Sequence, residues 1–374
     1  MKKTIVVFSN PFGYGPTGNA IPVIKSLLEK IKKTEDIEIV FAGSGLCMEI
    51  VSDVPVKKVL VNERDVEKVK EYLKTVENPL VISSQNYFCA RAAKELGITC
   101  AFIDILAWCW KVIPPENFVA NEIFWIRFPD IEKRIPEEYK NNIHIVSSII
   151  RRLPAVAVKE KQLMIHIGGA KYPLAEKMPY AYFDLMAKGL NALKADKNFD
   201  RVIFTGGSEA VDYIQPKVNN DLVVMIKENF IQELNKSAHV LTVAGVTSTF
   251  ESFSFNVPTS FLLPLNLSHM ALEDILRNHD CAPNRMEWEN YVTVHKDLRN
   301  MTEREAIAFI DSYAKIIVED ETLTKKYIED FVRLATTIPD NANQQKLIQY
   351  IGDTGGDEIV DILADRWELP KVEA

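Results

Sequence analysis

Short, almost continuous apolar runs alternate with amphipathic segments through the first 150 residues. The run TIVVF (4–8) leads through a loop rich in glycine and proline into a helical pattern from about Asn19 to Lys33. Further strands are predicted at residues 37–41, 58–61, 80–84, 98–104, 122–128 and 143–150, with helices at 65–76 and 86–97 between them. Apolar runs of this kind indicate parallel strands covered on both faces. We expect an N-terminal Rossmann-like domain over residues 1–150.

A second alternation follows a charged stretch, RRLPAVAVKEK (151–161), which we interpret as a linker because it contains a proline and no apolar period. Strands are predicted at 162–169, 200–207, 222–226, 238–245 and 257–264, and helices near 181–195, 229–237, 248–255 and 269–279. The pattern predicts a second Rossmann-like domain over 162–340. The apolar spacing after residue 300 predicts helices, and whether those in 341–374 cross back to the N-terminal domain is left open.

The composition is that of a soluble two-domain protein. The 374 residues are 47% hydrophobic and 26% charged, with a net charge of −8 that argues against binding to nucleic acid or anionic membranes. Five cysteines follow no metal-binding or disulfide spacing, which favours a cytoplasmic location and no metal site. The apolar run 4–8 is too short for a signal segment, and we expect no transmembrane segment.

The loop after the first predicted strand is the first candidate for ligand binding. Gly13, Gly15 and Gly18 match the spacing of a dinucleotide-binding loop, and Tyr14 lies between the first two. A dinucleotide site would also place an acidic residue after the second strand, where this chain has the sequence 41–43, Phe-Ala-Gly. The pattern therefore disfavours a nicotinamide dinucleotide and leaves a loop that can approach another ligand.

Three predicted strands of the second domain end in small residues. They are followed by Gly168-Gly169, by Gly206-Gly207 and by the segment 244–251. In that segment Thr247, Ser248 and Thr249 offer hydroxyl groups at a predicted helix start, which suits a diphosphate. Glu251 would then accept hydrogen bonds from the hydroxyls of a ribose. The alternative is that Glu251 is the N3 residue of a capping box.

The segment Gly245-x-Thr-Ser-Thr-x-Glu-Ser, followed by Val257-Pro258 and Leu263-Pro264, resembles the nucleotide-sugar signature of GT-B glycosyltransferases. It is similar to that of UDP-sugar transferases and of the peptidoglycan GlcNAc transferase. The resemblance implies an α/β GT-B fold of two facing Rossmann-like domains. It also implies a nucleoside-diphosphate sugar held by the C-terminal domain, an acceptor held by the N-terminal domain, and neither a metal nor a resident cofactor.

The sequence departs from this signature at several positions. Val243 and Asn256 stand where the family often has histidine and glycine, respectively. Ser268 and His269 stand where an acidic residue and a glutamine hold the sugar, so we expect these two residues to face it. No histidine precedes residue 144, so the first-loop catalytic histidine of many relatives is absent.

Asp104, at the end of a predicted strand on the expected ligand side, is our candidate for the general base. Its alternative role is that of a cap or a buried ion-pair partner, and Glu122 and Tyr14 are weaker candidates. Asn86 could orient an acceptor or cap the helix that follows it. Trp108 belongs to an aromatic group that could stack on an apolar acceptor, form core or make a subunit contact.

These observations predict a glycosyltransferase that acts with inversion and without metal. A sugar-nucleotide epimerase or hydrolase on the same fold is the first alternative. The second is a non-catalytic partner protein that has lost the sugar site, which the substitutions at 243, 256, 268 and 269 would explain. A homodimer is left open.

Overall fold

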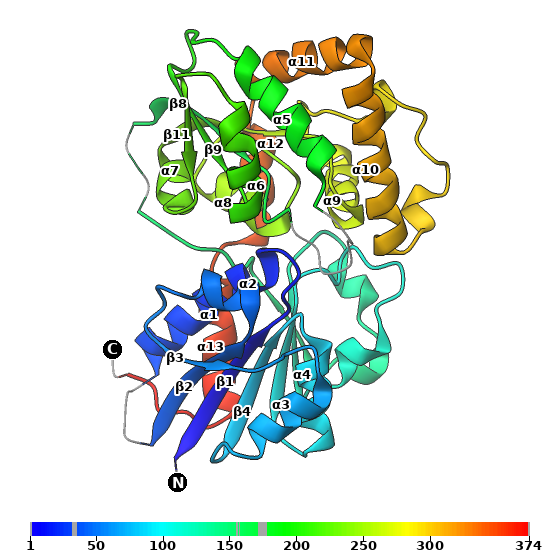
Figure 1. Cartoon of the computed structure of the whole chain (residues 1–374). Helices are drawn as coiled ribbons and strands as arrows, with labels where there is room; N and C mark the ends of the chain where they lie inside the picture. The colour runs from blue at the N-terminus through cyan, green and yellow to red at the C-terminus, as the bar shows by residue number, and fades with distance from the viewer. Residues whose placement is uncertain (1, 32–35, 155, 157, 171–177, 373–374) are drawn as a thin grey trace. The chain divides into compact units, whose positions relative to one another are not determined.

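The computed structural model describes residues 2–31, 36–154, 156, 158–170 and 178–372, and it divides the chain into two compact units (Figure 1). One unit comprises Met1–Arg151 and Ile351–Ala374, and the other comprises Arg152–Tyr350. Residues 32–33 of the first predicted helix and residues 155 and 157 of the predicted linker lie outside the described part. The chain thus returns to its first unit for its last helix.

The first unit is built on a sheet of seven parallel strands in the order β3-β2-β1-β4-β5-β6-β7. The strands are β1 (Lys3–Ser9), β2 (Ile37–Gly43), β3 (Lys57–Leu60), β4 (Pro79–Ser84), β5 (Cys100–Asp104), β6 (Glu122–Ile126) and β7 (Ile143–Val146). Val6 of β1 lies opposite Val40 on one side and Val81 on the other. The strand order reverses between β1 and β4, and this topology binds ligands beyond the carboxyl ends at such a point.

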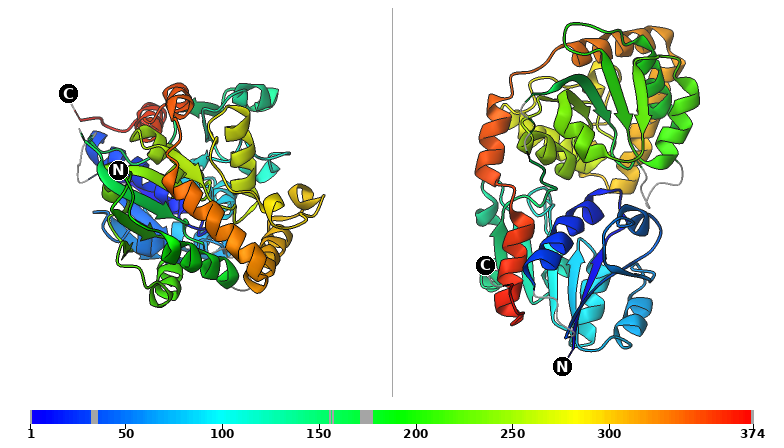
Figure 2. Two further views of the ribbon diagram at one scale, coloured as in Figure 1. Left: turned by 90° about the horizontal axis from the view of Figure 1, so that it is seen from above. Right: turned by 90° about the vertical axis from the view of Figure 1, so that its left-hand side faces the viewer.

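Helices cover both faces of this sheet. They are α1 (Gly15–Lys30), α2 (Gly45–Ile50), α3 (Val66–Leu73), α4 (Tyr87–Glu95) and α13 (Gly355–Arg366), with short 3-10 turns η1 (Pro115–Phe118), η2 (Ile131–Arg134) and η3 (Glu137–Tyr139). α1 and α13 pack side by side on one face, and α3 and α4 lie on the other (Figures 1 and 2). The apolar strands are therefore buried from both sides, which explains why they lack alternation.

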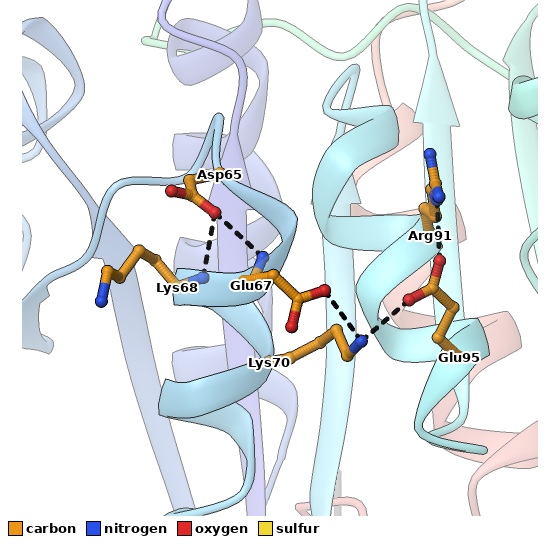
Figure 3. A network of polar contacts seen from close by, with 6 residues as sticks. All are labelled: Asp65, Glu67, Lys68, Lys70, Arg91 and Glu95. Carbon is orange, nitrogen blue, oxygen red and sulfur yellow. Dashed lines mark hydrogen bonds and ion pairs between the residues drawn. The ribbon is translucent and has the colours of Figure 1, made fainter.

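α3 and α4 are joined at their surface by a network of charged side chains (Figure 3). Lys70 of α3 lies 3.0 Å from Glu67 on its own helix and 3.0 Å from Glu95 on α4, and Arg91 lies 2.8 Å from Glu95. Asp65 caps α3 by accepting hydrogen bonds from the backbone of Glu67 and Lys68. Such exposed pairs contribute little each, so the network aligns two helices rather than stabilising the fold strongly.

The end of β7 is set by the C-terminal segment. The backbone N–H of Ser148 donates to the carbonyl oxygen of Gly352, and that of Ser147 donates to the carboxylate of Glu358. β7 therefore stops at Val146, although the apolar run 143–150 predicts a longer strand. Gly355 lies against Ser147 so closely that an added Cβ would be 2.0 Å from the Ser147 carbonyl oxygen. This contact fixes where α13 begins.

The second unit is built on five parallel strands in the order β10-β9-β8-β11-β12. The strands are β8 (Glu160–His166), β9 (Arg201–Thr205), β10 (Val223–Ile226), β11 (Ser237–Thr242) and β12 (Thr259–Phe261). The order reverses between β8 and β11, where Met164 lies opposite Val240. β12 is shorter than the predicted strand 257–264, and its register with β11 covers Thr259–Phe261.

Helices surround this second sheet. They are α5 (Tyr180–Ala192), α6 (Ser208–Ile214), α7 (Phe230–Lys236), α8 (Val246–Ser254), α9 (Leu267–Asn278), α10 (Glu303–Glu319), α11 (Glu321–Thr336) and α12 (Ala342–Ile351), with 3-10 turns η4 (Gln215–Lys217), η5 (Trp288–Asn290) and η6 (Leu298–Asn300). α2, α6 and α12 are not individually predicted by the apolar pattern. Within the described residues, no helix is both long enough and apolar enough to cross a membrane.

Glu358 provides a test of the tie between α13 and β7. Its carboxylate accepts hydrogen bonds from the Ser147 backbone and from the hydroxyls of Ser147 and Thr354, at 3.0, 2.5 and 2.6 Å. Partial burial acts to raise the pKa of Glu358, but these hydrogen bonds outweigh it and lower the pKa below 4.5. The ionised carboxylate therefore stabilises the fold above pH 4.5, and this contribution is lost as the pH falls through the lowered value.

We expect Glu358→Gln to lower the free energy of unfolding by about 1–2 kcal/mol at pH 7, since it removes charge-assisted hydrogen bonds in a half-buried setting. The difference from wild type should shrink toward pH 3. Urea unfolding at both pH values measures this, with Glu138→Gln in the exposed turn η3 as the matched control. A deficit equal at pH 7 and pH 3 would contradict the account.

Candidate functional site

The carboxyl ends of three neighbouring strands bring the glycine loops of the second unit together. Gly168 follows β8, and Gly206 and Gly207 follow β9, which pairs with β8. The backbone N–H of Gly207 donates to the carbonyl oxygen of Gly168 at 2.9 Å. The loop after β11 begins beside them, because β11 is the other neighbour of β8. The three predicted small-residue segments therefore lie along one edge of one sheet.

These loops require glycine because their backbones touch. A Cβ on Gly207 would lie 2.2 Å from the carbonyl oxygen of Gly169, and one on Gly206 would lie 2.7 Å from the side chain of Ile167. Gly168 has a φ of +65°, in the left-handed region that favours glycine. The glycine pairs thus allow two strand-to-helix loops to pack against each other at the switch point.

α8 presents its N-terminus at this edge. Its N-cap residue is Gly245, so the first-turn N–H groups of Val246, Thr247 and Ser248 lack partners within the helix. Thr247 and Ser248 are almost buried, and the hydroxyl of Thr249 is fully buried without a hydrogen-bond partner among the described residues. The first turn of a helix and the helix dipole favour an anion at this position.

Glu251 lies farther into α8 than a capping box allows. Because Gly245 is the N-cap, the N3 residue is Ser248, and the capping-box alternative for Glu251 is wrong. The Glu251 side chain is fully buried, and α8 carries it at the start of its second turn. Burying a carboxylate costs free energy unless polar groups bind it.

Ser268 and His269 occupy the first turn of α9. Asn266 caps this helix, and its side-chain oxygen accepts from the His269 backbone and the Ser268 hydroxyl, each at 2.8 Å. Nδ1 of His269 accepts from the backbone N–H of Leu265 at 3.3 Å, and Nε2 lies 3.4 Å from the side-chain nitrogen of Asn266. Burial lowers the pKa of His269 to about 3, so the ring is neutral at pH 7.

In the first unit, the predicted loop after β1 leads directly into α1. Gly13 has a φ of +60°, Tyr14 is the N-cap residue and Gly15 begins the helix. The Asn10 side chain donates to the carbonyl oxygen of Gln85 after β4, so the two loops at this switch point are tied together. Gln85 itself has a φ of +52°, an unusual conformation for a residue other than glycine.

Asn86 caps the helix that follows it, which is the structural one of the two roles predicted from the sequence. Its side-chain oxygen accepts from the Cys89 backbone and caps α4, while its nitrogen donates to the carbonyl oxygens of Ser9 and Glu63. Glu63 is a buried residue that the sequence analysis does not single out. Its Oε2 accepts from Ser44, and its Oε1 has no partner among the described residues. No motif marks it, because it lies in a connecting segment.

Asp104 ends β5 and is buried with both oxygens in use. Oδ1 accepts from the backbone of Leu106 at 2.8 Å, and Oδ2 accepts from the side chain of Asn117 at 2.7 Å. Burial raises the pKa of this carboxyl group above its ordinary value. A general base must reach the proton that it takes, so this geometry favours the structural alternative.

Glu122 and Trp108 are the remaining candidates from the first unit, and both make contacts within that unit. Glu122 begins β6, at the amino edge of the sheet and away from the loops, where it lies 2.6 Å from His144. Glu122 is therefore a wrong candidate for the base. Trp108 stacks on Phe128 with 5.0 Å between ring centroids, and its indole nitrogen donates to the carbonyl oxygen of Ile105. Among the described residues, no group of side chains could hold a metal ion.

The architecture matches solved structures over almost the whole chain. S. aureus MnaA in its UDP co-structure is 12% identical, with a TM-score of 0.56, and the match covers 99% of this chain and 98% of that chain. Arabidopsis thaliana UGT89C1 complexed with UDP is 11% identical, with a TM-score of 0.56 and coverage of 98% and 99%. UDP-GlcNAc 2-epimerase from Methanocaldococcus jannaschii is 12% identical, with a TM-score of 0.51 and coverage of 98% and 100%.

No protein-family model matches the sequence, and no curated protein matches it. The structural similarity nevertheless shows that the chain has the GT-B fold. It confirms the predicted α/β class, the two parallel sheets and the helical C-terminal region. At 11–12% sequence identity, this similarity shows the fold and does not identify the reaction.

The contact between Gly207 and Gly169 can be tested by adding one methyl group. We expect Gly207→Ala to lower the free energy of unfolding by about 1–3 kcal/mol, since the new Cβ cannot fit against the Gly169 carbonyl oxygen. Gly15→Ala is the matched control, because no atom lies within 4 Å of a Cβ there and α1 favours alanine. Chemical denaturation of both variants measures the difference. Equal stability of the two would contradict the close packing of the loops.

Proposed function

We propose that this protein is an enzyme that binds a nucleoside-diphosphate sugar, most simply a UDP-sugar, at the switch point of its second unit. The observation that carries the proposal is the convergence of the Gly168-Gly169 loop, the Gly206-Gly207 loop and the α8 N-terminus on one sheet edge. A diphosphate is favoured by close backbone approach and by the N-terminus of a helix, and both features lie at this edge. The solved structures of the same fold that are named as UDP complexes support the choice of nucleotide.

Each group in this edge has a proposed role. The N–H groups of residues 246–248 and the hydroxyls of Thr247 and Ser248 bind the diphosphate. Glu251 accepts hydrogen bonds from the ribose hydroxyls. Ser268 and His269 face the sugar, and the His269 ring is neutral at pH 7. The sugar is thus recognised by uncharged groups where the family signature has an acidic residue.

The proposed reaction is glycosyl transfer with inversion. An acceptor hydroxyl oxygen forms a bond to the anomeric carbon, the bond from that carbon to the diphosphate oxygen breaks, and the hydroxyl proton passes to a base. The diphosphate leaves with the electron pair, and the α8 N-terminus stabilises its charge. The first unit binds the acceptor in this proposal. An epimerase is the second candidate, because Asp104 has both oxygens engaged and the similar structures include a UDP-GlcNAc 2-epimerase.

Glu251 gives the sharpest test of the nucleotide site. We expect Glu251→Gln to weaken UDP binding on the order of tenfold, since it removes charge-assisted bonds of about 1.5–3 kcal/mol to the ribose hydroxyls. Titration calorimetry on folded protein measures the affinity. The matched control is Glu273→Gln, which changes a buried glutamate on the next helix, α9, and should bind UDP like wild type.

Equal loss of affinity in both variants would indicate a general disturbance of the unit, and unchanged affinity in the Glu251 variant would remove its ribose role. The reaction is then assigned by incubating the wild type with a panel of UDP-sugars, with and without acceptor alcohols. Release of UDP that depends on an acceptor supports transfer. A change of sugar configuration without an acceptor would instead support the epimerase.

A further inference from the structure

A carboxylate from another helix reaches the first turn of α9, which carries Ser268 and His269, the residues proposed to face the sugar. Glu303 is the first residue of α10. Its Oε1 accepts a hydrogen bond from the backbone N–H of Leu267, the first residue of α9, at 3.3 Å. The side chain of Asn266 accepts from the His269 N–H of the same turn. Two side chains, one from the cap and one from α10, thus bind the N-terminal N–H groups of α9.

Uncharged side chains hold the chain just before this turn. The hydroxyl of Tyr182 donates to the carbonyl oxygen of Leu263 at 3.0 Å, and the indole nitrogen of Trp288 donates to that of Pro264 at 2.9 Å. Both rings are buried. β12 leads into this connection and pairs with β11, so α9 begins at the same carboxyl edge as α8. Glu303 therefore adds an ionisable contact to a connection that uncharged groups hold in place.

Glu303 is partly buried, and its surroundings set the pH at which it ionises. Burial raises the pKa of Glu303 to about 7, and the hydrogen bond from the Leu267 N–H acts in the opposite direction. No charged side chain in the described part of the chain adds to this shift. The carboxyl group therefore changes its charge close to neutral pH, and the hydrogen bond from Leu267 favours the ionised form.

Other ionisable groups lie on the elements packed against α10, and among the described residues none is bonded to Glu303. On α9, burial lowers the pKa of His269 to about 3 and raises that of Glu273, which disfavours a charge on either. On α10 itself, Glu305 closes a capping box with Thr302. The charged groups on the other packed elements pair elsewhere: Arg299 of η6 with Asp274 of α9, Asp184 of α5 with Lys217, and Lys326 of α11 with Asp330.

Protonation changes the strength of the hydrogen bond between Glu303 and Leu267. A carboxylate is a stronger acceptor than a neutral carboxyl group, and a negative charge at a helix N-terminus is stabilised by the helix dipole. The first turn of α9 is therefore held most firmly when Glu303 is ionised. Sugar hydroxyls that bind Ser268 and His269 need this turn in place, because a hydrogen bond tolerates only small displacements.

We propose that Glu303 is a positioning residue for the sugar: it holds the Leu267 N–H, and thereby orients Ser268 and His269, most firmly in its ionised form. UDP-sugar affinity accordingly rises with pH through neutrality, while the diphosphate groups at α8 do not depend on Glu303. The proposal rests on the proposed function in placing the sugar at the first turn of α9. It assigns to that same site a regulation by pH.

The test is calorimetric titration of the full-length protein with UDP-glucose, UDP-N-acetylglucosamine and UDP at pH 6 and pH 8. We expect the wild type to bind at least one UDP-sugar about threefold to tenfold more tightly at pH 8. Glu303→Gln keeps an uncharged acceptor that does not titrate, so its UDP-sugar affinity should match that of the wild type at pH 6 and stay there at pH 8. Glu303→Ala removes the acceptor and should bind the UDP-sugar more weakly still. Glu319→Gln, at the exposed end of α10, is the matched control and should follow the wild type.

Leu267→Pro separates positioning from a direct contact between Glu303 and the sugar. Proline at the first position of a helix preserves the helix start and lacks the N–H. Leu267→Pro should therefore abolish the rise in UDP-sugar affinity between pH 6 and pH 8, whereas Leu267→Ala, which keeps the N–H, should retain it. A direct contact would leave the pH dependence in both variants. If Leu267→Pro fails to fold, Glu303→Gln and Leu267→Ala carry the test, because both change only partly buried side chains.

Three outcomes would overturn the positioning role: equal UDP-sugar affinity of the wild type at the two pH values, a pH dependence that persists in Glu303→Gln or Leu267→Pro, or equal loss of UDP and UDP-sugar affinity in Glu303→Ala. UDP binding without binding of either UDP-sugar would overturn it as well. In each of these cases the binding of UDP by the wild type leaves the nucleotide site standing. Absence of UDP binding removes the proposed function itself.

Discussion

The backbone contact between the loops after β8 and β9 is the constraint on which the candidate site depends. Gly207 donates to the Gly168 carbonyl oxygen, and no side chain fits between Gly207 and Gly169. Without this approach, two strand-to-helix connections could not end side by side at the point where the sheet order reverses. The N-terminus of α8 then completes the edge from the other side of β8. In the proposed site, the backbone rather than ionised side chains supplies most of the groups that would bind a diphosphate.

Much of this arrangement could be predicted from the sequence. Buried parallel strands leave continuous apolar runs, so β1, β2 and β4 were recognisable, and the glycine pairs marked positions where two backbones touch. Strand ends were less predictable, because distant partners decide them. β7 stops where Ser147 meets Glu358, a residue 211 positions away. α6 packs against α5, and the side chain of Gln344 on α12 donates to the carbonyl oxygens of Thr259 and Cys281, contacts that no local pattern reveals.

In the candidate site, too, local sequence predicts the elements, whereas distant partners decide the role of each side chain. The sequence placed Thr247 and Glu251 on the right element, but it could not fix the helix start that excludes a capping box. Asp104 and Asn86 were chosen as polar residues at strand ends, and both use their side chains to hold neighbouring loops. Hydrogen-bond occupancy favours a structural role for Asp104, and it depends on partners such as Asn117 that no local pattern reveals. Glu63 was missed for the related reason that no motif surrounds it.

The two units differ in the groups that they place at the carboxyl ends of their strands. In the second unit, helix and loop backbones form the sheet edge at which we propose that a diphosphate binds. In the first unit, buried polar side chains such as Asn86 and Asp104 hold the loops at the carboxyl ends of the strands. The GT-B fold accounts for both edges, since each sheet reverses its strand order once, and the particular side chains at those edges carry the chemistry.

The most direct test of the nucleotide site is a crystal structure of the full chain with UDP. The account predicts density for the diphosphate within hydrogen-bond distance of the backbone N–H groups of residues 246–248, with the ribose hydroxyls beside Glu251. UDP bound elsewhere on the protein, or a ribose distant from Glu251 with the diphosphate away from α8, would contradict it.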